Sequence, residues 1–389
     1  MQAAVSLFSV LRAAAAVTAA VLVVALGACT GAPDPPDQQS PVPQPSTSAP
    51  AFAAVLEKYS SEMLAGGATA VIIEMKSRIG EWSSAAGVRT LENGEPVQLT
   101  DETHIGTITA SMLAVSVMKL VEEGKIRLDG RITEYLPELE GMITAPGPVT
   151  VRSLLSHRSG IPEYWESPVD LSNRTLSHTD RISAAAAIPW PAGAAMSYSY
   201  SGTSYPVLAL LVEKLRGRSI GDVIRTDVVE PLDLPDTHMA GEGPGPQNMV
   251  HGYVRSDGGD LVDSALNPFH QGSADTGMIS TVPDLNAYLA GLLEGKLLAT
   301  GTVAEMQHPK YEQYGLGLMR LYDPCSNNVY LGHVGVVRGY SALALISADG
   351  SRQVAMAVAR APTSEFVGFD DPQAFAMART AVEALSLAC

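Results

Sequence analysis

Segments with strand character gather at the two ends of the chain and leave a long middle without them. Near the N-terminal end, "ATAVIIEMK" (68–76) predicts a buried strand and "GEWSSAAGVRT" (80–90) predicts its hairpin partner. Near the C-terminal end, four more segments predict strands: "YGLGLMRLY", "NVYLGHVG", "YSALALISA" and "RQVAMAVAR". Amphipathic patterns at 51–65 and 371–388 predict a helix at each end. The sequence therefore predicts an α/β fold, in which an antiparallel sheet is flanked by terminal helices and carries a large helical insertion.

The folded part is expected over residues 51–389. Its α/β part covers about 51–105 and 306–389, and its helical part covers about 106–305. A hydrophobic content of 46% with 17% charged residues is typical of a globular chain.

The N-terminus has the pattern of an export signal. Arg12 precedes the apolar run "AAAAVTAAVLVVAL", which ends in "LGAC" at Cys29. This ending resembles the lipobox of bacterial lipoproteins, which implies a signal peptide over 1–28 and a lipid on Cys29. The alternative is an ordinary secretory signal with an incidental cysteine. Residues 29–50 are rich in Pro and Ser and predict an extended tether. We therefore expect a domain anchored by lipid at the extracytoplasmic face of the bacterial cell membrane.

Two cysteines remain after the predicted lipidation site, Cys325 and Cys389. Exported proteins fold in an oxidising compartment, where such a pair readily forms a disulfide. We expect a Cys325–Cys389 bridge that holds the C-terminal helix to the strand region before His333. Two unpaired thiols are the alternative.

Charge and motif content exclude several function classes. The net charge is −16, and it becomes −17 when the predicted signal is removed with Arg12. Nucleic-acid binding is therefore not expected, because phosphate contacts need clustered cations. The eight histidines are scattered without metal-site spacing, and no Gly-rich phosphate loop precedes a helix. We expect neither a metal nor another cofactor.

A known family is suggested by ordered matches over nearly all of the predicted domain. The matching segments are "IGTITA" (105–110), "KLVEEGKIRLDGRITEYLPEL" (119–139), "SLLSHRSGIPEY" (153–164), "SYSGTSYPVLALLVEKLRGRS" (199–219), "GSADTGMISTVPDLNAYLAGLLEGKLL" (272–298), and "YGLGL" (314–318) with "GHVGVVRGYSA" (332–342). Together they resemble the serine β-lactamase and penicillin-binding protein superfamily, in the branch of class C β-lactamases and D-alanyl-D-alanine carboxypeptidases.

The resemblance implies an active site whose first motif is altered. It places the nucleophilic serine of the family at Thr107 and the lysine that takes its proton at Ala110. Threonine keeps a hydroxyl, but its β-branching crowds and stiffens it. Alanine cannot act as a base, and a hydroxyl without a base is a poor nucleophile at neutral pH.

The other two motifs are preserved in part. In one register, the family tyrosine falls at Tyr200 and the family asparagine at Gly202. In a rival register, the tyrosine is Tyr198, and Tyr200 takes the asparagine position; packing of these tyrosines in a loop is a structural alternative. The segment His333-Val-Gly335 resembles the third motif of the family. The resemblance also implies an oxyanion hole made by the backbone N–H groups of Thr107 and Val336, which side-chain substitutions leave intact.

A second pair with serine-lysine spacing, Ser116 and Lys119, lies on the same predicted helix over 104–128. This pair starts nine residues beyond Thr107, which is half a turn out of phase and about 13.5 Å further along. We therefore expect it to face away from the site. Ser111 is better phased but is expected to lie too deep, and we expect His157 to be a loop histidine with its hydrogen bonds satisfied.

Three functions are compatible with these observations. The first is a cell-envelope lipoprotein that has lost its acylation machinery and binds peptidoglycan-type peptides, other acyl ligands or an envelope partner. The second is a weakly active hydrolase of the carboxypeptidase, esterase or β-lactamase type that uses Thr107, with Tyr200 or His333 as base. The third is a scaffold without enzymatic activity.

Overall fold

The computed structural model describes residues 49–389 except 144, 146, 170, 172–173, 191–196, 243–247, 309–312 and 363–370. The predicted signal peptide, Cys29 and almost all of the predicted tether lie outside the described residues. No helix in the described part of the chain is long and apolar enough to cross a membrane.

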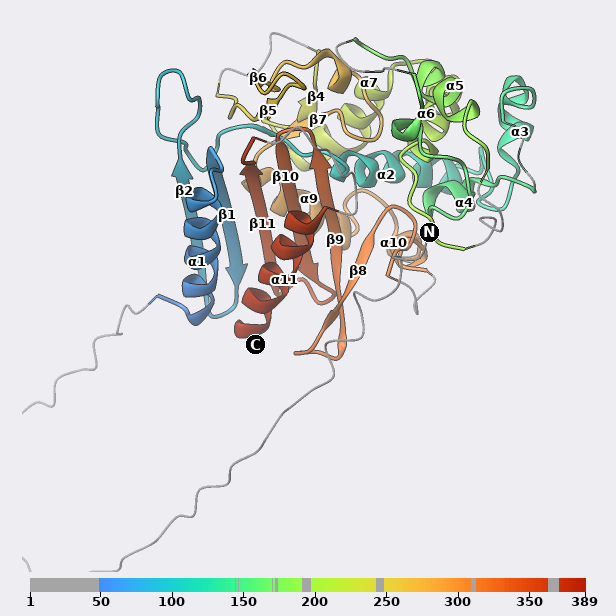
Figure 1. Ribbon diagram of the computed structural model, residues 1–389. Helices are drawn as coiled ribbons and strands as arrows, with labels where there is room; N and C mark the ends of the chain where they lie inside the picture. The colour runs from blue at the N-terminus through green and yellow to red at the C-terminus, as the bar shows by residue number, and fades with distance from the viewer. Residues whose placement is uncertain are drawn as a thin grey trace, which may run out of the picture. The chain divides into compact units, whose positions relative to one another are not determined.

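One antiparallel sheet of six strands forms the centre of the domain, in the order β2-β1-β11-β10-β9-β8. Its N-terminal strands are β1 (Ala70–Ser77) and β2 (Gly80–Gly87). The C-terminal strands are β8 (Met319–Asp323), β9 (Asn328–Val337), β10 (Tyr340–Ser347) and β11 (Arg352–Ala359). Pairing of β1 with β11 joins the two ends of the chain (Figure 1). The predicted α/β fold with an antiparallel sheet is thus confirmed.

Helices cover both faces of this sheet. α1 (Ala51–Ala65) and α11 (Pro372–Leu387) pack on one face, against large side chains such as Ile73, Leu343 and Met356. The alternate positions on the other face are often alanine, as at Ala344 and Ala357. Successive strand side chains point to opposite faces, so this pattern separates a large-residue face from a small-residue face. Small side chains let α9 (Val282–Leu293) pack close to β10 and β11.

The middle of the chain adds helices and two small sheets. The longer helices are α2 (Ile108–Glu122), α5 (His178–Ala186) and α6 (Ser204–Arg216). The shorter ones are α3 (Ile132–Tyr135), η1 (Pro137–Leu139), α4 (Val151–Leu155), η2 (Tyr164–Glu166), α7 (Ile220–Ile224), the π-helix η3 (Arg225–Val229), α8 (Glu230–Leu232), η4 (Pro268–His270) and α10 (Thr300–Met306). The small sheets are β3-β7-β4 (Thr103–His104, Met278–Ser280, His238–Met239) and β5-β6 (Tyr253–Arg255, Leu261–Asp263). Sequence patterns did not predict these short strands.

α2 is shorter than the helix predicted over 104–128. Its N-terminal neighbour Gly106 has φ +52°, and Gly124 has φ +68° just beyond its C-terminal end. Both lie in the left-handed region that favours glycine and stops a right-handed helix. The prediction was therefore wrong at both ends, and His104 belongs to β3 instead.

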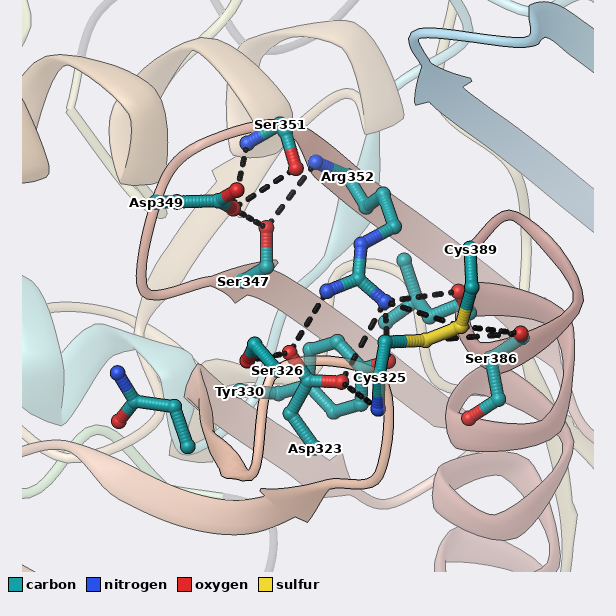
Figure 2. Close-up of polar contacts among 12 residues, drawn as sticks. Asp323, Cys325, Ser326, Tyr330, Ser347, Asp349, Ser351, Arg352, Ser386 and Cys389 are labelled. Carbon is teal, nitrogen blue, oxygen red and sulfur yellow. Dashed lines mark hydrogen bonds and ion pairs between the residues drawn. A yellow bond between two sulfur atoms is a disulfide. The ribbon is translucent and has the colours of Figure 1, made fainter.

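The predicted Cys325–Cys389 disulfide is present, with 5.8 Å between the Cα atoms. It joins the turn after β8 to the end of α11, beside the guanidinium of Arg352 (Figure 2). This guanidinium forms an ion pair with Asp323 at 2.7 Å and donates to the Tyr330 hydroxyl at 3.0 Å. Arg352 and Asp323 are both buried, and a buried ion pair needs such additional hydrogen bonds to offset its desolvation. The disulfide thus links β8 to α11 at the end of the sheet where this ion pair lies.

Candidate active site

The N-terminal end of α2 lies against β9, the strand that carries the third motif. A Cβ added to Gly106 would lie 2.7 Å from the backbone nitrogen of Val336. A Cβ on Gly335 would collide with the backbone oxygen of Ile105. These two glycines allow the backbone before Thr107 to touch the backbone of β9. The two N–H groups expected to form an oxyanion hole, those of Thr107 and Val336, therefore belong to adjoining segments.

The hydroxyl of Thr107 is engaged by a backbone carbonyl. Thr107 is 7% exposed, and its Oγ1 donates to the carbonyl oxygen of Val334 at 2.9 Å. Ala110 lies one turn along the helix, is buried, and offers no group that could accept the proton. In this arrangement the hydroxyl of Thr107 donates to a carbonyl oxygen and not to a base, whereas activation of a hydroxyl nucleophile needs a base.

His333 is held neutral by its own contacts. Its Nδ1 lies 2.6 Å from the carbonyl oxygen of Val334, which can only accept, so Nδ1 carries the proton. Its Nε2 then accepts from the Tyr314 hydroxyl at 2.8 Å. Burial lowers the pKa of His333 to about 4. Both ring nitrogens are occupied, so His333 provides neither a cation nor a free base to the site.

Tyr200 and His157 stack beside this arrangement. Their ring centroids are 4.4 Å apart, and the ring of Tyr314 lies 4.8 Å from that of His157. Tyr200 is partly buried, and Tyr198 is 42% exposed. Burial, followed by the nearby Glu163 and Asp275, raises the pKa of Tyr200 far above its usual value. Tyr200 therefore keeps its proton and is a poor general base.

The N–H group of Ser201 points at the Nδ1 atom of His157, at 3.2 Å. The carbonyl oxygen of Ser201 lies 3.1 Å from the same nitrogen, so Nδ1 faces both backbone groups of Ser201, whereas Nε2 has no partner among the described residues. Burial lowers the pKa of His157 to about 3. The expectation of a fully satisfied loop histidine was thus only half right.

Two carboxyl groups approach Gly202, which lies two residues after Tyr200. The Oε2 atom of Glu163 accepts from the Gly202 N–H at 2.5 Å. Asp275 accepts from the Tyr164 hydroxyl at 2.9 Å and from the Ser273 hydroxyl at 2.5 Å. Burial first, and then the charge of Asp275, raises the pKa of Glu163 to about 8.

This raised pKa predicts a pH dependence of stability. The folded protein holds the Glu163 proton up to about pH 8, whereas an unfolded glutamate loses it near 4.5. The folded state therefore binds more protons in this range, and the contribution of Glu163 to stability falls as pH rises toward 8. We expect Glu163→Gln to gain stability relative to wild type between pH 6.5 and 8.5, because the other titrating groups affect both proteins alike. Urea unfolding at both pH values measures this, and an unchanged difference between variant and wild type contradicts it.

The Ser116–Lys119 pair lies elsewhere. Ser116 is fully buried, and its hydroxyl has no partner among the described residues. Lys119 instead forms an ion pair with Asp227 at 3.7 Å. Ser111 is also buried and donates to the carbonyl oxygen of Ile108 at 2.8 Å, which occupies its proton. The hydroxyl of Ser111 therefore faces the helix backbone, and among the described residues no hydrogen bond or ion pair joins the side chains of Ser116 and Lys119 to Thr107 or Ala110.

No group of three or more potential metal ligands occurs among the residues that the structure describes. A cavity of about 330 Å³ lies between the α7–α8 region and β4, lined among others by Arg225, His238 and Glu242. None of the predicted site residues lines it.

Comparison with known proteins decides the family. The sequence profile of the Beta-lactamase family matches residues 52–378, which is most of the chain. The chain belongs to the beta-lactamase family. This confirms the predicted superfamily of serine β-lactamases and penicillin-binding proteins.

Beta-lactamase family members of several activities are similar to this chain. The esterase EstB of Burkholderia gladioli is 26% identical over 201 residues, which cover 47% of this chain and 49% of the esterase. The D-alanyl-D-alanine-carboxypeptidase/endopeptidase AmpH of Escherichia coli (strain K12) is 24% identical over 256 residues, 63% of each protein. The matches span less than two thirds of the length of these curated relatives. The crystal structure of a D-stereospecific amidohydrolase from Streptomyces sp. superposes with a TM-score of 0.70 and 27% identity, covering 84% of this chain and 97% of the other.

Three residues that contact the beta-lactamase-family motifs here were missed by sequence reasoning: Glu163, Asp275 and Tyr314. Each lies inside a segment that resembles the family, "SGIPEY", "GSADTG" and "YGLGL" respectively. No local spacing connects them with Gly202 or His333, so no pattern in the sequence indicated their contacts. The missing side chain at Gly202 was the one available signal that another group fills that space.

Proposed function

We propose that this protein is a cell-envelope lipoprotein whose beta-lactamase-family domain binds D-aminoacyl compounds of the peptidoglycan type without acylation. The observation that carries the proposal is the state of the first motif. The Thr107 hydroxyl donates to the Val334 carbonyl, and the residue one turn along is Ala110. A positioned general base is worth about 10² to 10⁴ in rate. A site without such a base can bind, but it should acylate poorly.

The backbone N–H groups that remain at the start of α2 and in β9 indicate the class of ligand. The N-terminal end of α2 and the adjoining β9 backbone supply N–H donors suited to a carbonyl oxygen. Thr107 N–H has no acceptor among the described residues. Two similar proteins are named for D-amino acid compounds: a D-alanyl-D-alanine-carboxypeptidase/endopeptidase and a D-stereospecific amidohydrolase. We therefore propose a carbonyl compound of a D-amino acid as ligand. The predicted lipid on Cys29 would hold the domain at the extracytoplasmic membrane face.

Labelling with a fluorescent penicillin tests the loss of acylation. We expect no stable covalent adduct on the purified wild-type protein, because no base removes the Thr107 proton. Heat-denatured protein controls for non-specific dye, and an active penicillin-binding protein in the same gel controls for the reagent. A stable adduct mapped to Thr107 by peptide mass spectrometry would overturn the proposal. Thr107→Val would then show whether any turnover depends on that hydroxyl.

Binding of a small ligand without its hydrolysis distinguishes a ligand-binding domain from a scaffold that only docks other proteins. We expect simple D-alanyl amides to raise the thermal unfolding temperature and to remain unhydrolysed in the recovered mixture. Capture of an envelope protein without any such shift would favour the scaffold.

A further inference from the structure

Glu163 fills the space beside Gly202, where the resemblance places an asparagine. A Cβ added to Gly202 would lie 2.9 Å from Oδ2 of Asp275 and 3.3 Å from each carboxyl oxygen of Glu163. A distance of 2.9 Å is too short for a real Cβ contact, so one carboxyl group would have to move. The carboxyl groups can approach this backbone only because residue 202 has no side chain.

Glu163 is held there by two backbone donors. Its Oε2 accepts from Gly202 N–H at 2.5 Å, and its Oε1 accepts from Trp165 N–H at 3.4 Å. Each carboxyl oxygen keeps a further lone pair for another donor. Glu163 and Tyr200 are both partly exposed, so a ligand beside Tyr200 can reach the carboxyl group.

Neither Glu163 nor Asp275 forms a direct ion pair with a basic side chain in the described part of the chain. Arg181 comes near, but its guanidinium donates to the Tyr164 hydroxyl and the Phe269 carbonyl. An ammonium group placed beside Glu163 would stabilise the ionised form of its carboxyl group and lower its pKa.

We infer that Glu163 takes the place of the missing second-motif side chain and makes the site beside Tyr200 select ligands that carry a free ammonium group. An asparagine amide could donate to a ligand carbonyl, whereas a carboxyl group held by backbone N–H groups accepts from an ammonium. The inference rests on the proposed function and narrows its ligand class. D-Aminoacyl compounds with a free amino group would bind, and their N-acylated forms would bind poorly.

A double-mutant cycle tests the placement of Glu163 without any ligand. Gly202→Asn alone is expected to lower the unfolding temperature by about 5 °C, because the new side chain overpacks the space that Glu163 and Asp275 occupy. In a Glu163→Ala background, the same change should cost measurably less, and the remaining cost is due to Asp275, which the new Cβ would approach more closely. Equal costs in both backgrounds would overturn the placement.

Calorimetric titration of the mature protein at pH 7 tests the selectivity, with D-alanine amide and N-acetyl-D-alanine amide as probes. Wild type is expected to bind the free amine at least ~10-fold more tightly, the range of a charge-assisted hydrogen bond. Glu163→Gln should reduce this preference to about twofold or less, since Gln keeps an acceptor for Gly202 N–H but loses the charge. Glu166→Gln is the matched control, because Glu166 is exposed and does not contact Gly202; it should keep the preference.

Proton release gives a second readout. Glu163 faces Asp275, Glu166, Tyr164 and Tyr200, and it holds a proton at pH 7 because its pKa is raised to about 8. Binding of the ammonium should displace that proton, which titration in buffers of different ionisation enthalpy measures. Glu163→Gln should abolish the release.

The outcomes separate the two proposals. Tighter binding of the N-acetyl amide, or a preference that survives Glu163→Gln, overturns the ammonium selectivity and leaves the proposed function standing. Binding of neither amide by wild type overturns both.

Discussion

A double variant with Thr107→Ser and Ala110→Lys is expected to form a covalent adduct with penicillin, whereas the wild type is expected to form none. The double variant restores an unbranched nucleophile and a base three residues along the same helix face. Labelling by fluorescent penicillin should be faster than in Thr107→Ser alone by about 10² to 10⁴, the worth of a positioned base. The rate of adduct formation in a gel time course measures this.

Single variants are the controls for this result. Thr107→Ser alone lacks a base, and Ala110→Lys alone lacks the unbranched hydroxyl, so each should label slowly or not at all. The unfolding temperature of Ala110→Lys shows whether the longer side chain is accommodated, because Ala110 is buried and its carbonyl lies near Gly317. A correctly folded double variant that still resists labelling would mean that the substitutions at Gly202 and Val334 also block acylation.

Removing the disulfide is expected to produce the largest loss of stability. The bridge joins residues 64 apart in sequence, and closing a loop of that length stabilises the folded state by about 4 kcal/mol in the chain-entropy account. Cys389→Ser should therefore lower the unfolding temperature by roughly 6 °C. Calorimetry under non-reducing conditions measures the change.

The location of the bridge sharpens this prediction. Asp323 accepts from the Cys325 N–H at 2.9 Å and also pairs with Arg352 (Figure 2). Cys325→Ser should match Cys389→Ser, and the double variant should be no worse than either, since one bond is lost in each case. Reductant should destabilise wild type and leave the variants unchanged. If removing the disulfide lowers the free energy of unfolding by less than about 1 kcal/mol, the Arg352–Asp323 ion pair is sufficient to hold this end of the sheet together.

Most of the architecture could be predicted because strand and helix periodicity are local properties. The six strands of the main sheet and both terminal helices follow from such patterns. The short strands β3 and β4 could not, since two residues carry no periodicity and depend on pairing with β7. The start of α2 was misplaced because hydrophobic residues continue through Ile105, and only the left-handed backbone of Gly106 separates strand from helix.

The sequence by itself indicated the family, placed Ala110 where the resemblance puts a lysine, and favoured a bridge between Cys325 and Cys389. These depend on residue identity, spacing and the small number of cysteines. Only the tertiary structure decided that the Thr107 hydroxyl donates to Val334, that His333 is neutral beside Tyr314, and that Glu163 lies against Gly202. Those contacts join segments tens to hundreds of residues apart. Burial and the direction of each hydrogen bond depend on how the folded chain brings those segments together.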